Sequence, residues 1–103
     1  MAGRDDVEVV DNPSELRYEL RRGPDVVGQI RYATAPGLVL LIHTDVAPSV
    51  EGQGLGSTLV RGALDDIRAR GLRVVPVCPF VADYLRRHPG YGDLVEPDPP
   101  TWE

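Results

Sequence analysis

His43 and Asp45 lie two residues apart near the end of an apolar stretch, and Cys78 follows a second apolar stretch. Side chains two apart on a strand share one face of the sheet, so the imidazole and the carboxylate would be neighbours. A histidine that titrates near neutral pH can take a proton from an ammonium group or an attacking amine. A cysteine thiolate can act as a nucleophile. The structural alternatives are a hydrogen-bonded core histidine and a small buried cysteine.

Three glycines at alternate positions lie in the stretch VEGQGLGS, between an apolar stretch and a helical pattern. Unpaired N–H groups at a helix start attract anions, and glycine lets them approach closely. The chain contains no lysine, which excludes a Walker phosphate loop. A Rossmann fingerprint is disfavoured because Ser57 stands where its last glycine would be, and because the chain is too short for two mononucleotide-binding halves. The stretch is therefore either an anion cradle or an unliganded helix start.

The periodicity of apolar residues predicts the elements that would position these groups. Alternation predicts strands at 15–21 and 26–33, and an apolar stretch at 38–47 predicts a central strand. Helical spacing begins at Leu55 and stops before Gly71, a strand follows at 72–77, and a short helix follows at 81–88. We expect an α+β fold in which an antiparallel meander of three strands runs into a βαβ crossover and a short C-terminal helix.

Length and charge set the limits of function. A chain of 103 residues predicts one domain, at 13–95, after an acidic segment at 1–12 and before a proline-rich tail at 96–103. A net charge of −5 argues against a nucleic-acid partner, and a single cysteine excludes an intramolecular disulfide or a zinc site of paired cysteines. We expect no metal, no signal peptide and no membrane segment, and hence a soluble cytoplasmic protein.

The order of strand, glycine loop and helix resembles the GNAT superfamily of acetyl-CoA-dependent N-acetyltransferases. Its signature, Gln/Arg-x-x-Gly-x-Gly/Ala, falls on Glu51-Gly52-Gln53-Gly54-Leu55-Gly56, where Glu51 replaces the usual Gln or Arg. The chain is similar to the minimal stand-alone members of this superfamily from about Tyr18 to Val95. The similarity rests on HTDVAPSVEGQGLGSTLV and VVPVCPFVADYLRRHPGY.

This resemblance implies a site for acetyl-CoA. The pantetheine arm would enter a gap between the strands on either side of the helix, where Pro76 and Pro79 flank Cys78 and interrupt pairing. The main chain at Asp45, Val46 and Ala47 would pair with the pantetheine amides. The main-chain N–H groups of the glycine loop would hold the pyrophosphate; they belong to Gln53, Gly54, Leu55, Gly56 and Ser57.

The resemblance also implies a reaction, in which an acetyl group is transferred to an amine such as a lysine side chain or a polyamine. His43 and Cys78 stand at positions that the minimal group uses for its active-site residues. We favour direct attack with His43 as base over transfer through Cys78, because no adjacent lysine or arginine activates that thiol. The alternatives are a non-catalytic CoA-binding or regulatory module, and an interaction domain whose loop binds nothing.

Overall fold

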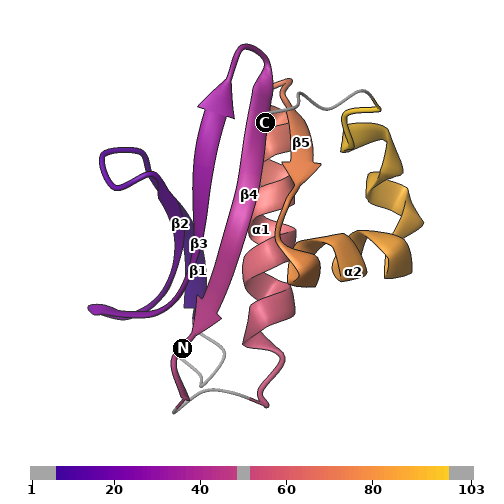
Figure 1. Ribbon diagram of the computed structural model, residues 1–103. Helices are drawn as coiled ribbons and strands as arrows, with labels where there is room; N and C mark the ends of the chain where they lie inside the picture. The colour runs from indigo at the N-terminus through magenta and orange to yellow at the C-terminus, as the bar shows by residue number, and fades with distance from the viewer. Residues whose placement is uncertain (1–6, 49–51, 98–103) are drawn as a thin grey trace.

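A single sheet of five strands, in the order β1-β2-β3-β4-β5, forms the body of the protein (Figure 1). The computed structural model describes residues 7–48 and 52–97. The strands are β1 (Val7–Asn12), β2 (Arg17–Arg22), β3 (Asp25–Ala35), β4 (Leu38–Val46) and β5 (Arg73–Pro76). The helices are α1 (Leu55–Ala69) and α2 (Pro79–Arg87), followed by the 3-10 helix η2 (Pro89–Leu94).

The pairing of the strands confirms the predicted α+β fold. Strands β1 to β4 are antiparallel neighbours, and β5 pairs with β4 in parallel after the crossover through α1. Helix α1 ends where the sequence indicated: Gly71 N–H donates to the Arg68 carbonyl and Leu72 N–H donates to the Ile67 carbonyl, which is the Schellman pattern. The mixed sheet therefore follows the expected order of meander, helix and parallel strand.

The sheet begins one strand earlier than the sequence analysis placed the domain. Val7–Asn12, within the segment expected to be a separate acidic terminus, pairs with Arg17–Arg22 along its whole length. Val7 and Val9 pack against the hydrophobic core from this strand. Their period-2 spacing was a strand signal, but the acidic residues around it concealed it. The boundary at residue 13 is corrected accordingly, because β1 is part of the sheet.

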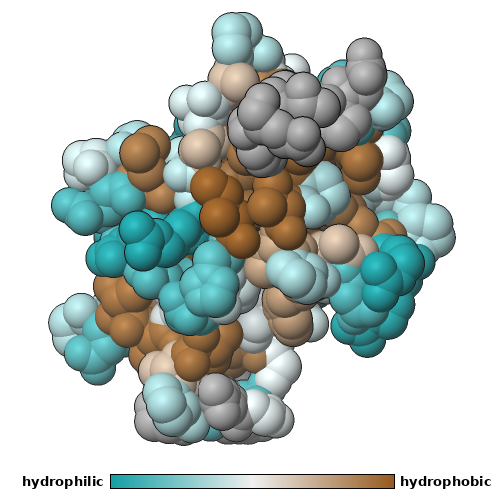
Figure 2. All heavy atoms as spheres, viewed as in Figure 1, coloured by the Kyte–Doolittle hydropathy of each residue, from teal (hydrophilic) through white to brown (hydrophobic). Residues whose placement is uncertain are grey.

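The helices cover one face of the sheet, and the other face is open (Figure 1). Helix α1 lies behind β4 and β5 in this view, and its apolar stripe is fully buried. On the near face, hydrophilic side chains lie beside an apolar patch (Figure 2). We call the near side the open face and the other the helix face. The core lies on the helix face and includes Leu20, Ile30, Leu41, Leu59, Leu64, Ile67, Val74 and Val81.

The contact between α1 and β1 has no room for a larger residue at Gly62. A Cβ placed there would lie 2.6 Å from Cβ and Cγ2 of Val9. We therefore expect Gly62→Ala to lower the free energy of unfolding by about 1 kcal/mol or more, because overpacking outweighs the better helix propensity of alanine. Urea denaturation measures this, with Gly90→Ala as control, since no atom lies within 4 Å of a Cβ at Gly90. A Gly62→Ala protein as stable as wild type would contradict the packing of β1 on α1.

Candidate active site

Strands β4 and β5 stop pairing midway along β4. Their pairing runs from Leu38 opposite Arg73 to Leu41 opposite Pro76, and the last bond is from Cys78 N–H to the Leu41 carbonyl, at 2.9 Å. Strand β4 continues to Val46, so residues 42–46 have no partner in β5. The predicted loss of pairing near Pro76 is confirmed: Val77 N–H donates to the Val75 carbonyl of its own strand, at 3.0 Å. The end of β4 thus has an unpaired edge in the middle of the molecule.

A β-bulge at Ile42 decides which way the end of β4 faces. His43 lies opposite Arg31, but Leu41 lies opposite Tyr32, so Ile42 is an extra residue in β4. Strict alternation would place His43 on the same face as the buried Leu41. Because of the bulge, His43 instead lies exposed on the open face, and Thr44 turns toward the helix face. Consecutive residues therefore serve opposite sides of the sheet.

A cavity of about 400 Å³ lies on the helix face, between the end of β4 and the start of α1. Main-chain atoms of glycine residues and a few apolar side chains form its walls. The lining residues are Thr44, Val46, Gly52, Gly54, Leu55, Gly56, Ser57 and Phe80. Val46 and four positions of the glycine loop, Gly54 to Ser57, were predicted for cofactor binding, and they meet here. We call this space the helix-face cavity.

The start of α1 offers main-chain donors to this cavity. The first bond of the helix runs from Thr58 N–H to the Gly54 carbonyl, at 3.3 Å, so the N–H groups of residues 55–57 have no partner inside the helix. Gly54 is the N-cap, with φ 74°, and no side chain caps the helix. The first turn contains no acidic residue. The helix start therefore suits an anion, and the apolar wall beside it suits an uncharged chain.

Two of the residues predicted to pair with a pantetheine arm are already used inside the sheet. Ala47 N–H donates to the Val27 carbonyl, at 2.8 Å. Because hydrogen-bonding sides alternate along an antiparallel strand, the main chain of Asp45 faces β3 as well, opposite Gln29. The main-chain groups facing the unpaired edge belong to Thr44 and Val46. The predicted pairing of pantetheine amides with the main chain of Asp45 and Ala47 is therefore corrected. The same prediction for Val46 stays open.

Gln53 is the one member of the predicted pyrophosphate set that does not line the cavity. Its side-chain Oε1 accepts a hydrogen bond from Arg22 Nη2, at 3.5 Å. Glu51, where the sequence departs from the superfamily signature, lies outside the described residues, so its predicted role is not addressed.

A second cavity, of about 410 Å³, lies on the open face beside His43. It is lined by Glu15, Leu16, Arg31, Tyr32, Ile42 and His43. His43 Nε2 is 2.9 Å from Asp45 Oδ1, and Gln29 Nε2 donates to Asp45 Oδ2 at 3.4 Å. The imidazole is thus oriented by a carboxylate that is itself held by an amide. We call this space the open-face cavity.

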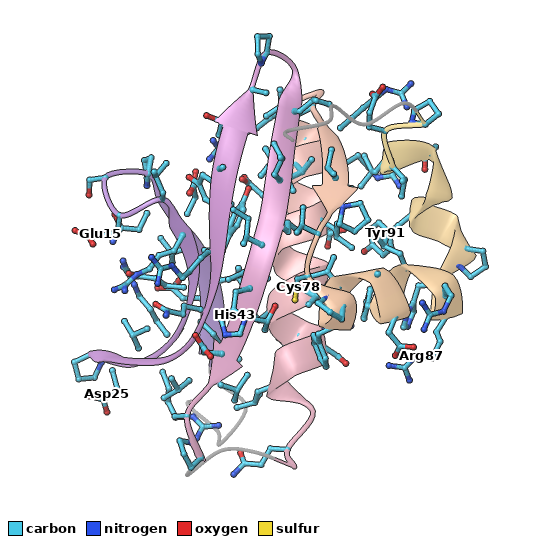
Figure 3. The ribbon with its side chains drawn as sticks, viewed as in Figure 1. Glu15, Asp25, His43, Cys78, Arg87 and Tyr91 are labelled. Atoms are coloured by element: carbon cyan, nitrogen blue, oxygen red, sulfur yellow. The ribbon has the colours of Figure 1, made fainter. Side chains whose placement is uncertain are left out.

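Cys78 and His43 lie on opposite faces of the sheet. The thiol is buried, and its Sγ lies 3.4 Å from Thr44 Oγ1 on the helix face. Figure 3 shows the sulfur beside β4 at the start of α2. Since Thr44 and His43 point to opposite faces, the bulge that exposes His43 also separates it from Cys78. The structure brings together Cys78 with Thr44, and His43 with Asp45.

Two side chains of the helix-face cavity, Thr44 and Phe80, were not among the predicted site residues. Thr44 lies between His43 and Asp45, so alternation put it on the face opposite theirs, and the bulge at Ile42 makes that the helix face. Phe80 packs against the glycine loop so closely that a Cβ at Gly56 would lie 3.0 Å from the Phe80 ring. The sequence signal available for Phe80 was an aromatic residue directly after Cys78 and Pro79.

The comparisons with known proteins bear on this arrangement. The model of the GCN5-related N-acetyltransferase family matches residues 17–94. The chain belongs to this family. Residues 17–94 contain all the lining residues of the helix-face cavity and, except for Glu15 and Leu16, those of the open-face cavity. Members of this family generally use acetyl-CoA. The prediction of an N-acetyltransferase is thereby confirmed at the level of the family.

Two solved structures share the GCN5-related fold. One is the solution structure of a GCN5-like protein from Staphylococcus aureus, with TM-score 0.67 and 20% identity, covering 89% of this chain and 90% of that one. The other is the ribosomal-protein-S18-alanine N-acetyltransferase from Escherichia coli, with TM-score 0.57 and 22% identity; it covers 73% of this chain but 51% of that one. A comparison with curated protein sequences finds no match. At these sequence identities the likeness shows a shared fold and nothing further.

The described residues lack two further features, a membrane-spanning helix and a cluster of metal ligands. None of the helices in 7–48 and 52–97 is long and apolar enough to cross a membrane. Within the same ranges, no three His, Cys, Asp or Glu side chains are grouped to hold a metal ion.

Proposed function

We propose that the protein transfers an acetyl group from acetyl-CoA, bound in the helix-face cavity, to an amine bound in the open-face cavity. The observation that carries this proposal is the pair of neighbours His43 and Thr44. They line different cavities on opposite faces of the sheet, at the edge of β4 that β5 leaves unpaired. A donor and an acceptor could therefore meet at this edge from the two sides.

The helix-face cavity offers main-chain donors for the pyrophosphate of CoA and an apolar wall for its pantetheine chain. N–H groups of Leu55, Gly56 and Ser57 would bind the pyrophosphate, and Val46 and Phe80 would contact the pantetheine chain. The Thr44 and Val46 main chain would pair with its amides in strand fashion. When bound, acetyl-CoA supplies an acetyl group activated as a thioester, which exchanges its C–S bond for a C–N bond to the acceptor.

His43 is the proposed base. With Nε2–H donating to Asp45, the lone pair of Nδ1 is left to accept a proton from the acceptor amine. Asp45 then stabilises the charged imidazole, and Gln29 holds Asp45 in place. Deprotonation matters because an ammonium group has no lone pair with which to attack a carbonyl carbon. His43 would act from the open face, which is the side where the acceptor enters.

Cys78 is not needed for this route. Its Sγ is buried beside Thr44, and no described side chain that could take its proton lies within hydrogen-bond distance. Cys78→Ala should therefore keep turnover near that of wild type. A loss of turnover as large as that caused by removing His43 would favour transfer through the thiol.

Two measurements test the proposal. Saturating CoA should raise the melting temperature by several degrees, because binding to the folded state alone stabilises it. Acetyl-CoA mixed with a panel of amines should then release thiol only when an acceptor is present. A thermal shift without acceptor-dependent release would favour the non-catalytic CoA-binding module, and no shift at all would overturn the CoA site.

A further inference from the structure

Several charged side chains of the open face are paired with one another. Glu19, which is 2% exposed, accepts hydrogen bonds from Arg17 Nε at 2.7 Å and Arg21 Nη2 at 2.6 Å. Hydrogen bonds from Asn12 and Arg21, above all, hold the pKa of Glu19 at about 2, so it remains charged. Asp45 is likewise taken by His43. These groups form closed ion pairs.

Arg31 is the exception in the middle of this face. It lies between Arg17 on β2 and His43 on β4, and no described carboxylate pairs with it. It is exposed and lines the open-face cavity. A guanidinium presents a planar fork of donors that matches a carboxylate. Glu19 and Asp45 are paired with other groups, and the described residues show no ion pair between Arg31 and Glu15, which lines the same cavity, so the Arg31 guanidinium is available to the carboxylate of a ligand.

Two irregular backbone features point apolar side chains at the same cavity. Leu16 has φ 54°, which is unfavourable for a residue with a side chain, and it is 50% exposed. Ile42 is the extra residue of the β4 bulge and is 42% exposed. Glu15, beside Leu16 in the turn between β1 and β2, adds a carboxylate to the lining (Figure 3). The cavity therefore offers a cation, an anion and an apolar wall.

The geometry points to an acceptor that carries a carboxylate next to its amine, that is, a free amino acid with an apolar or partly apolar side chain. This inference rests on the proposed function and narrows its acceptor. Arg31 and His43 are opposite each other on adjacent strands, so their Cβ atoms lie about 5 Å apart. An α-amino acid has its amine and carboxylate on one carbon, so its carboxylate would bind Arg31 while its amine faces His43. A cavity of about 410 Å³ is large enough for such a molecule.

A need for a carboxylate beside the amine distinguishes between the acceptors that the sequence analysis suggested. A polyamine has no carboxylate for Arg31, and a lysine side chain within a protein has none nearby. Free lysine has one, and its stem could lie along Leu16 and Ile42. The opposite charges of Glu15 and Arg31 suit a zwitterion better than a polycation.

Matched pairs of acceptors test this inference. The full chain is assayed for thiol release from acetyl-CoA with leucine against 3-methylbutylamine, and with lysine against cadaverine; each amine is the decarboxylated form of its amino acid. The kcat/KM should favour the amino acid by about tenfold or more, the size expected for a charge-assisted pair. Arg31→Gln should abolish most of this preference. Arg61→Gln, a change on the exposed side of α1, should preserve it. Equal kcat/KM values within each pair would overturn the inference.

A binding experiment keeps the inference independent of turnover. Leucine titrated into 15N-labelled protein should shift the amide signals of Leu16, Ile42 and His43, and Arg31→Gln should weaken binding about tenfold or more. If amines are acetylated without any preference, acetyl transfer stands and the carboxylate requirement falls. If leucine binds at these residues but no amine is acetylated, the amino-acid site stands and acetyl transfer falls. If leucine neither binds nor reacts, the inference is overturned.

Discussion

Replacing His43 by glutamine should lower kcat for acetyl transfer by about 100-fold or more, the usual loss when a positioned base is removed. Glutamine keeps the bulk and can still donate to Asp45, but it has no nitrogen that accepts a proton. His43 lies on an exposed stretch of β4 outside the core, so the change should leave the fold intact. Stopped-assay kinetics with a good acceptor measure the effect, and a CoA thermal shift equal to that of wild type shows that the donor still binds.

The only other histidine provides a matched control. His88 stacks on Tyr84, with 3.9 Å between ring centroids, and its Nδ1 is 2.8 Å from the Tyr84 carbonyl. It lines neither cavity. His88→Gln should therefore retain kcat. A His43→Gln enzyme with near-normal kcat would contradict the role of His43.

Asp45 is a positioning residue in this scheme, because it acts through the imidazole. Asp45→Asn should lower kcat less than His43→Gln and leave the KM of the acceptor nearly unchanged, since the carboxylate that orients the imidazole is lost. A merely structural role for Asp45 would alter stability and leave kcat unchanged.

Much of this arrangement could be predicted from the sequence, because apolar periodicity controls most of it. The alternation in 15–21 and 26–33 and the helical stripe after Leu55 predicted the sheet order and the crossover. The same patterns placed the glycine loop between a strand and a helix. The prediction failed at the first strand, β1. Its period-2 signal consists of Val7 and Val9 alone, and the acidic residues around them suggested a separate terminal segment.

The relation between His43 and Cys78 could not be predicted, because it depends on one inserted residue. The period-2 rule correctly put His43 and Asp45 together, but it does not say which face they share. The bulge at Ile42 sets that face by pairing Arg31 with His43 while Tyr32 pairs with Leu41. A bulge has no reliable signature in a single sequence, since any residue can occupy it. Phe80 was not predicted as a site residue for a related reason, since its contact with Gly56 joins two elements distant in the chain.

Introducing an acidic residue at Ser57 should affect stability and CoA binding in opposite directions. Ser57 lies in the first turn of α1, where a carboxylate interacts favourably with the helix dipole. Ser57→Asp should therefore raise the free energy of unfolding without ligand by about 0.3–1 kcal/mol. The same charge would face the pyrophosphate at the proposed donors, and we expect it to weaken CoA binding about 100-fold through repulsion and loss of space.

Calorimetry and thermal melts of Ser57→Asp and the neutral isostere Ser57→Asn separate these effects. Added salt should recover part of the affinity of Ser57→Asp, because ions screen the repulsion between exposed charges. If Ser57→Asp binds CoA as tightly as Ser57→Asn, the pyrophosphate does not lie at this helix start. The chain has 16 acidic residues, yet none lies in the first turn of α1, where one would stabilise the helix. A CoA pyrophosphate bound at this helix start would therefore meet no carboxylate in the first turn of α1, as the proposed site requires.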